Sequence, residues 1–164
     1  IELKHKKIAH ITGDVKTQAA AKRLEGYKRA LEKNGIKIRQ DYIFETDYSR
    51  GAARSAAENL IKAADPATAV FVASDAMALE VMAVARELGK DIPRDLSIVG
   101  FDDNPSGLYG PVGLTTVRQP LIRMAEESVK ELNRLIALKK NAPKKILLPA
   151  ELVIRESCRS LAGD

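Results

Sequence analysis

The chain has 164 residues, a formal net charge of +5 and one cysteine, Cys158. Its length fits one domain, or one domain with part of another. One cysteine excludes an internal disulfide, two histidines with one cysteine argue against a structural zinc site, and no run of about 20 apolar residues could span a bilayer. The mild positive charge permits an acidic partner without requiring one. The sequence opens abruptly, without a signal-peptide pattern, so we expect a fragment of a longer protein.

Strand-like and helix-like stretches alternate through the first half of the chain. Residues 8–12 (IAHIT) predict a strand. Apolar residues recur at helical spacing over residues 17–34, and Gly35 is typical of a helix C-terminus. We expect a short second strand at residues 42–44 and a second helix at residues 50–64. The order strand, helix, strand, helix is typical of α/β proteins.

The middle of the chain repeats this order. Residues 69–73 are apolar throughout, which is typical of a strand covered on both faces. Ser74 and Asp75 are expected to cap a helix over residues 76–88, and a further buried strand is expected at residues 96–101. The pattern predicts an α/β fold with a doubly wound parallel sheet. Ligands of such sheets bind outside the carboxyl ends of the strands, so the turns at those ends are the expected binding region.

The last third of the chain carries a long amphipathic helix. It is expected over residues 119–140, after a short strand at residues 115–117, and two short strands at residues 146–148 and 152–154 are expected to follow. Burying one Leu or Ile side chain is worth ~1.5–3 kcal/mol, so the apolar face of this helix requires a partner surface. That surface is either the same sheet or a second lobe, and the pattern leaves both open.

Several segments resemble motifs of LacI-family bacterial transcriptional regulators, and they occur in the order of that family. They are residues 8–13 (IAHITG), 23–27 (RLEGY), 69–78 (AVFVASDAMA), 89–103 (GKDIPRDLSIVGFDD), 114–120 (LTTVRQP) and 148–157 (LPAELVIRES). One such motif would be weak evidence, whereas this ordered set is specific and covers nearly all of residues 7–158.

The resemblance implies a periplasmic-binding-protein-like fold of type I, of which the chain is mainly the C-terminal lobe. Residues 1–118 would form this lobe, residues 119–143 a crossover helix of the N-terminal lobe, and residues 144–164 the returning segment and closing strand. The helix-turn-helix domain and N-terminal lobe of the family are not visible here. We therefore expect the apolar face of the long helix to be covered by another copy of the chain, or to be misplaced or poorly ordered.

The same resemblance implies the function. We expect a cytoplasmic, homodimeric repressor core that binds a small polar effector such as a sugar or nucleoside and contacts operator DNA only through a helix-turn-helix domain absent from this chain. Ligand binding would shift the DNA-binding state of the dimer. No cofactor, metal, membrane contact or catalysis is expected. Thr17 and Ala19 are small where purine-binding relatives carry a second arginine with a threonine, which favours a sugar.

The resemblance also implies five ligand-binding residues: Thr17, Arg23, Tyr48, Ser74 and Asp102. The planar fork of Arg23 suits two acceptor oxygens, and the carboxylate of Asp102 suits paired hydroxyls or a ring N–H. Tyr48 matches an aromatic residue that stacks on ligand. Ordinary structural roles are the alternatives. Arg23 could pair with a neighbouring carboxylate, Asp102 could form a turn and Ser74 could cap a helix. An exposed loop position is the alternative for Tyr48.

The dimer contacts of the family include outer helices of the lobe. The helix at residues 76–88 and the loop at residues 108–111 are therefore the interface candidates. The residues concerned are Met77, Leu79, Met82, Leu108 and Tyr109. Core packing is the alternative for the three on the helix.

A periplasmic binding protein and an enzyme are the two alternatives to a repressor core. A periplasmic sugar-binding protein of a transporter shares the fold, but residues 92–98 resemble the repressors. A small α/β enzyme has little support, because Asp102 and Asp103 are adjacent in one turn and cannot face each other across a scissile bond. The sequence also lacks a G-x-G-x-x-G or P-loop motif. His10 lies within a predicted strand, where a structural histidine is expected.

Overall fold

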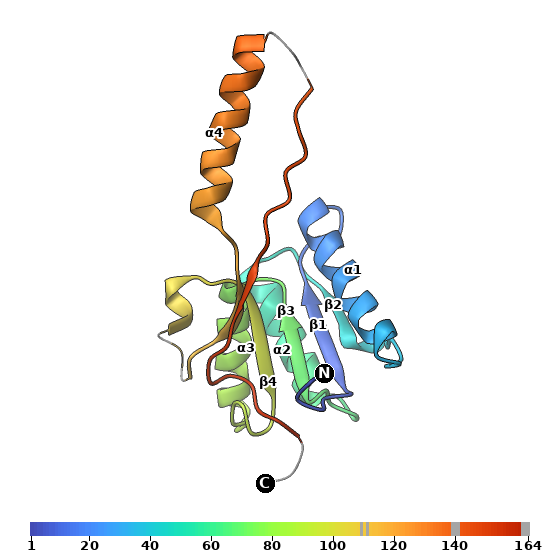
Figure 1. Cartoon of the computed structure of the whole chain (residues 1–164). Helices are drawn as coiled ribbons and strands as arrows, with labels where there is room; N and C mark the ends of the chain where they lie inside the picture. Colours follow the sequence, from blue (N-terminus) through green and yellow to red (C-terminus); the bar gives the residue numbers. More distant parts are fainter. Residues whose placement is uncertain (109, 111, 139–141, 162–164) are drawn as a thin grey trace.

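The computed structural model describes residues 1–108, 110, 112–138 and 142–161. Helices and strands alternate along most of the chain, and Figure 1 shows their arrangement. In chain order they are β1 (Ile8–Thr12), α1 (Gln18–Lys33), β2 (Ile43–Glu45), α2 (Arg50–Lys62), β3 (Ala69–Val72), α3 (Asp75–Glu87), β4 (Ser97–Asp102), β5 (Thr115–Arg118), α4 (Leu121–Leu138) and β6 (Glu151–Val153). Two short 3-10 helices occupy Gln40–Tyr42 and Pro105–Leu108.

The strands form one sheet in the order β2-β1-β3-β4-β5-β6. β1 to β5 are parallel and β6 is antiparallel to β5, so the predicted, mainly parallel α/β sheet is confirmed. The prediction of a strand at residues 146–148 is wrong. Ile146 and Leu147 are exposed, and no described strand lies beside them whose backbone groups could pair with theirs.

The hydrophobic core lies between one face of the sheet and the helices α2 and α3. Ile11, Val70 and Ile98 extend from three neighbouring strands into it, and Leu60 and Met82 meet them from the helices. β3 is fully buried on this face alone, since Val70 and Val72 are buried whereas Ala69 and Phe71 on the other face are half-buried, so the expectation of a strand covered on both faces is only partly met. α1 lies on the other face.

Local sequence signals set the helix boundaries. Thr17 caps α1, since its hydroxyl accepts a hydrogen bond from the Ala20 N–H at 3.4 Å. Gly35 follows with φ +66°, a backbone conformation that costs glycine little. Ser74 caps α3 by accepting from the Met77 N–H at 3.3 Å.

The expectation that Asp75 shares this capping role is wrong. Its carboxylate is buried and instead accepts hydrogen bonds from the Thr116 hydroxyl at 2.6 Å and the Asn104 N–H at 2.7 Å. Gly100 makes room for it, because a Cβ there would lie 2.2 Å from Asp75 Oδ1. Asp75 thus joins the start of α3 to β5 and to the turn after β4.

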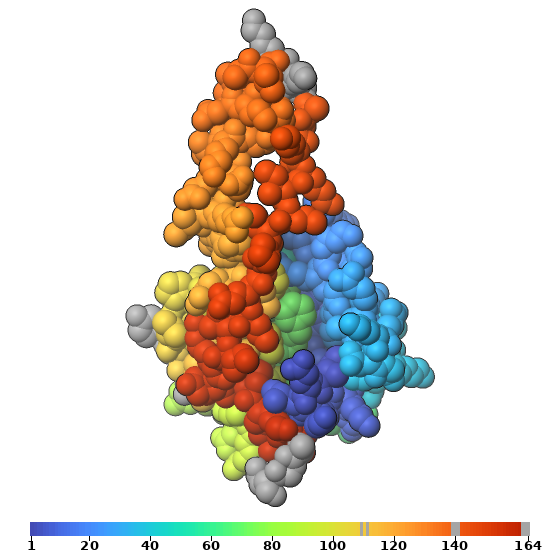
Figure 2. Space-filling model, in the orientation of Figure 1, coloured from blue at the N-terminus to red at the C-terminus, as the bar shows by residue number. Residues whose placement is uncertain are grey.

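α4 projects away from the sheet together with the returning segment, as Figures 1 and 2 show. None of its residues is buried, and its apolar side chains face solvent. Its described polar contacts outside the helix reach the returning segment. Arg134 donates to the Ala142 carbonyl at 3.1 Å, and the Lys144 N–H donates to Glu131 at 2.8 Å. α4 does not pack on its own sheet. Among the described residues, no helix combines the length and apolar character needed to cross a membrane.

Candidate functional site

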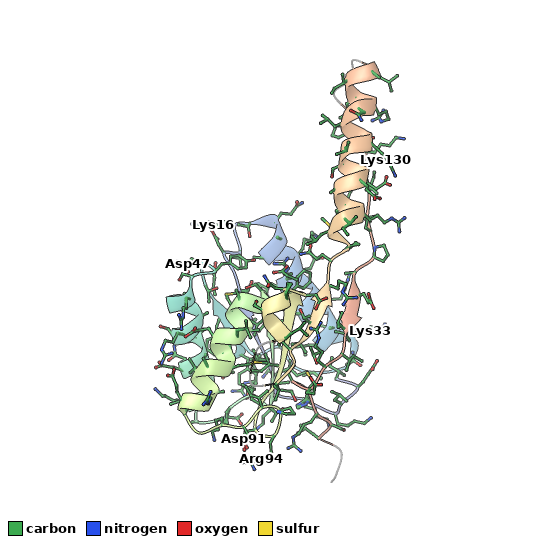
Figure 3. The ribbon with its side chains drawn as sticks, turned by 90° about the vertical axis from the view of Figure 1, so that its left-hand side faces the viewer. Lys16, Lys33, Asp47, Asp91, Arg94 and Lys130 are labelled. Carbon is green, nitrogen blue, oxygen red and sulfur yellow. The ribbon has the colours of Figure 1, made fainter. Side chains whose placement is uncertain are left out.

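Three turns of the sheet meet at one edge. Because β1, β3 and β4 are parallel neighbours, Gly13, Ser74 and Asp102 follow or end their strands on the same side. Figure 3 shows Lys16 and Asp47 at this edge and Asp91 and Arg94 at the opposite one. The structure therefore gathers the predicted turns at a common rim, which is where open α/β sheets bind ligands.

Arg23 crosses this rim from the second turn of α1. Its Nη1 donates to the Ala73 carbonyl at 3.1 Å, and its guanidinium carbon lies 3.9 Å from the centroid of the Phe101 ring. Its Nη2 lies 3.9 Å from Asp102 Oδ1. The side chain is only 17% exposed. Contacts with the ends of β3 and β4 thus fix a cation over an aromatic face.

Asp102 ends β4 with an unusual backbone, φ +120°. Its Oδ1 accepts a hydrogen bond from the Gln119 side-chain amide at 2.8 Å. Burial raises the pKa of the carboxyl above its ordinary value, although Arg23 and the Gln119 hydrogen bond act in the opposite direction. Its neighbours therefore offset only part of the cost of burying the charged carboxylate. The carboxylate can still accept hydrogen bonds from a ligand.

Tyr48 reaches the same group from the loop between β2 and α2. Its hydroxyl accepts from Arg23 Nη1 at 3.4 Å, and its backbone has φ +65°. The other two predicted ligand residues already have structural partners. Thr17 and Ser74 cap α1 and α3, and the Thr17 hydroxyl also donates to the Asp14 carbonyl at 2.7 Å. A ligand-binding role for any of these residues stays a prediction.

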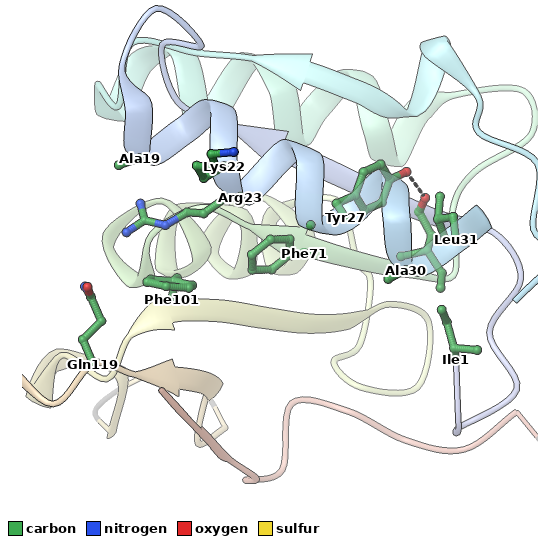
Figure 4. A pocket seen from close by; sticks show the side chains of 12 residues that line it. Ile1, Ala19, Lys22, Arg23, Tyr27, Ala30, Leu31, Phe71, Phe101 and Gln119 are labelled. Carbon is green, nitrogen blue, oxygen red and sulfur yellow. Dashed lines mark hydrogen bonds between the residues drawn. The ribbon is translucent and has the colours of Figure 1, made fainter. Parts of the chain in front are cut away.

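A cavity of about 720 Å³ extends from Arg23 along the sheet face on which α1 lies (Figure 4). Its floor is aromatic, with Phe71, Phe101 and Tyr27, and Gln119 stands with Arg23 at its polar end. Of the five predicted ligand residues, only Arg23 lines it. Asp102 adjoins it through Gln119, whereas Tyr48 lines a separate hollow near the start of α3.

Phe101 and Gln119 were not singled out by sequence reasoning as site residues. Both lie inside motifs that the sequence analysis quotes, residues 89–103 and 114–120. A motif does not say which of its side chains face the rim, so only the fold separates these two from their neighbours.

His10 lies between two of these aromatic rings. Its ring stacks on Phe71 and Tyr27, with centroids 4.7 and 5.1 Å away, and its Nδ1 hydrogen-bonds with the Phe71 carbonyl at 2.8 Å. Burial lowers its pKa to about 4, so the ring is neutral at physiological pH. This geometry agrees with the expected structural histidine. Within the described ranges, no three His, Cys, Asp or Glu side chains are grouped so as to hold a metal ion.

The predicted dimer residues fall into two groups. Met77 and Met82 are each 1% exposed, so assigning them to an interface is wrong: their side chains fill the core beneath α3 and have no surface to offer. Leu79 is half-buried, and Leu108 is exposed. Tyr109 lies outside the described residues.

Known proteins share this fold over most of the chain. The family of periplasmic binding protein-like domains matches residues 1–158. The chain is 43% identical over 136 residues to the HTH-type transcriptional regulator MalR of Clostridium butyricum, covering 83% of this chain and 40% of MalR. Among solved structures, a complex of the transcriptional regulator CelR with cellobiose matches with a TM-score of 0.90 and 31% identity, over 95% of this chain and 48% of that one.

A lac repressor dimer bound to operator and an anti-inducer matches with a TM-score of 0.87 and 28% identity, over 97% of this chain and 55% of that one. The chain thus spans about half the length of the regulators that it matches. It belongs to the family of periplasmic binding protein-like domains, and its relatives there are LacI-family transcriptional regulators.

Proposed function

We propose that this chain is the effector-sensing part of a LacI-type transcriptional repressor and that the rim at the strand ends binds a small polar ligand, a sugar in particular. The observation that carries the proposal is the Arg23–Asp102 pair, 3.9 Å apart, beside the face of Phe101. A fixed fork of donors, a carboxylate acceptor and an aromatic surface together complement a molecule with several hydroxyls and an apolar ring face.

The relatives support this class of ligand. CelR is described in complex with cellobiose, a sugar, and the lac repressor is described as a dimer bound to operator. Both proteins extend well beyond the part that this chain matches. Contact with operator DNA is therefore assigned to a helix-turn-helix domain outside residues 1–164, in a cytoplasmic homodimer.

Domain organisation gives the proposed mechanism. Residues 1–118 form the C-terminal lobe, residues 119–143 cross into an N-terminal lobe, and residues 144–164 return. The unburied apolar face of α4 supports this division, because such a face requires a partner surface. Ligand between the two lobes stabilises one relative orientation and shifts the DNA-binding state through that differential affinity.

The homodimer interface is assigned to the outer surface of α3 and the loop after β4. Leu79 and Leu108 are its candidates within the described residues, since both offer apolar surface. A periplasmic sugar-binding role is less well supported, because the relatives reported above are named as transcriptional regulators. Their names likewise give no support to an enzyme.

Isothermal titration calorimetry of the intact protein tests the proposal, with cellobiose, maltose, ribose and guanosine as probes. Arg23→Ala and Asp102→Asn should each weaken binding of the active probe by about 10- to 100-fold, because each removes a charge-assisted hydrogen bond. Arg94→Ala is the matched control, since Arg94 is exposed at the opposite edge of the sheet. Unchanged affinity in both rim variants would show that the ligand binds elsewhere.

A further inference from the structure

Gly13 and Tyr48 are in unusually close contact. Gly13 is buried at the end of β1, and a Cβ built on it would lie 1.9 Å from Cε2 and 2.0 Å from Cζ of the Tyr48 ring. No real side chain tolerates such distances. Gly13 does not have the positive φ that requires glycine at Gly35 and Gly89. The glycine is therefore needed for space alone, and the Tyr48 ring fills that space.

The loop that carries Tyr48 is hydrogen-bonded to the end of β1, next to Gly13. Thr46 donates to the Thr12 carbonyl through its N–H at 3.1 Å and through its hydroxyl at 2.7 Å. The Tyr48 N–H then donates to the Thr46 hydroxyl at 3.3 Å. A positive φ is rare in a bulky residue and persists only where the surroundings enforce it. These bonds hold the Tyr48 backbone in that conformation and direct the ring onto Gly13.

The hydroxyl end of the Tyr48 ring contacts Arg23, which is one of the proposed ligand-binding residues. The Tyr48 hydroxyl accepts from Arg23 Nη1, which also donates to the Ala73 carbonyl. A side chain at position 13 would force the ring out of its place and remove this contact. The residue that sets the ring position is therefore not the tyrosine itself but the glycine beneath it.

We propose that Gly13 is a positioning residue that seats the Tyr48 ring beside Arg23 and thereby sets the affinity of the rim for its ligand. The inference rests on the proposed function, since it assigns Tyr48 and Arg23 to the ligand site. It goes beyond that function in naming a residue that touches no ligand and acts only through the tyrosine.

A double-mutant cycle separates this role from general packing. Calorimetry of the intact protein, with the sugar probe that binds, compares wild type, Gly13→Ala, Tyr48→Ala and the double variant. Gly13→Ala and Tyr48→Ala should each weaken binding by about tenfold, the worth of one aromatic contact. The double variant should bind as Tyr48→Ala does, because the added methyl group then displaces nothing.

Gly51→Ala is the matched control, since a Cβ at Gly51 meets nothing within 4 Å and the residue is exposed. It should leave affinity unchanged. Independent, additive losses in the double variant, or unchanged affinity in Gly13→Ala, would overturn the proposal.

A measurement without ligand keeps the proposal testable if Gly13→Ala folds poorly or no probe binds. In NMR spectra of the intact protein labelled with 13C-glycine, the ring current of Tyr48 should displace the Gly13 Hα signals upfield. Tyr48→Leu should move them back. Signals that are not displaced in wild type would show that the ring is not seated on Gly13. Displaced signals in a protein that binds none of the four probes would show that the Tyr48 ring lies on Gly13 but would refute the proposed function.

Discussion

α3 and α4 are both helices rich in apolar residues, yet α3 is largely buried and α4 is exposed. Eight of the 13 residues of α3 are buried between α2 and the sheet, whereas none of the 18 residues of α4 is buried. The sequence patterns differ as well, because α3 is apolar over most of its surface whereas α4 carries one apolar stripe beside a charged face. An apolar stripe predicts that a helix face will be covered, but it carries no information about which surface covers it.

The largest effect expected from this contrast concerns one substitution made both in the body of the protein, which comprises the sheet with α1, α2 and α3, and in α4. Leu60, in α2, is 1% exposed, and Leu132, in α4, is 57% exposed. Leu60→Ala should lower the free energy of unfolding of the 164-residue chain by about 2–5 kcal/mol, because it removes buried methyl groups and leaves a cavity. Leu132→Ala should change it by less than about 0.5 kcal/mol. Urea unfolding followed by circular dichroism measures both.

The pair of variants serves as its own control, since the chemical change is identical. A loss in Leu132→Ala as large as that in Leu60→Ala would mean that α4 is covered in the 164-residue chain, by its own sheet or by a second copy, and the contrast between the body and α4 would disappear.

A second prediction concerns acid and the side of the sheet on which His10 lies. Burial lowers the pKa of His10 from its ordinary 6.5 to about 4. In this interval the unfolded chain binds a proton that the folded chain does not, so stability falls as the pH drops from about 6.5 towards 4. The whole difference is about 3 kcal/mol. Urea unfolding of the 164-residue chain across this range measures it.

His10→Phe is the informative variant, because it keeps an aromatic ring between Phe71 and Tyr27 and removes the titrating group. Its unfolding free energy should fall less steeply with acid than that of wild type. The remaining slope should include His5, since burial lowers the pKa of His5 as well. Identical pH profiles for wild type and variant would refute the assignment to His10.

The smallest effect on stability is expected where the chain leaves the sheet for α4 and returns from it. We call this place the joint; it is formed by Asp103, Arg118 and Arg155. Asp103 accepts from Arg155 Nη2 through one carboxylate oxygen and from Arg118 Nε through the other, each at 2.6 Å. Asp103→Asn should lower the unfolding free energy of the chain by about 1–2 kcal/mol, since one arginine loses its charged acceptor. Arg118→Ala should cost less than about 1 kcal/mol, because Arg118 is half-exposed and solvent screens its ion pair. The reverse order would show that Asp103 is not the centre of this joint.

Sequence reasoning predicted the parallel sheet, its helices and the meeting of three turns at one edge, because periodicity and capping residues act locally. Sequence reasoning failed where the contacts of a side chain involve residues far away in the sequence. Asp75 looked like a cap but bonds to Thr116 across the fold, and Met77 and Met82 were interface candidates although both are buried in the core.

The candidate site shows the same limit. Motifs placed Arg23 and Asp102 at the rim, but the contact of Arg23 with the Phe101 face and the bond from Gln119 to Asp102 depend on how strands far apart in sequence are stacked. A sequence pattern gives the ends of such strands but not the directions of their side chains.

Hydrogen exchange of the intact protein, with and without a bound sugar, tests directly whether the ligand binds at the rim of strand ends. Ligand should slow exchange in the turns after β1 and β3, at the end of β4 and at the start of α4, where α4 joins the sheet. Slowed exchange confined to the opposite edge of the sheet, around Asp91 and Arg94, would contradict it.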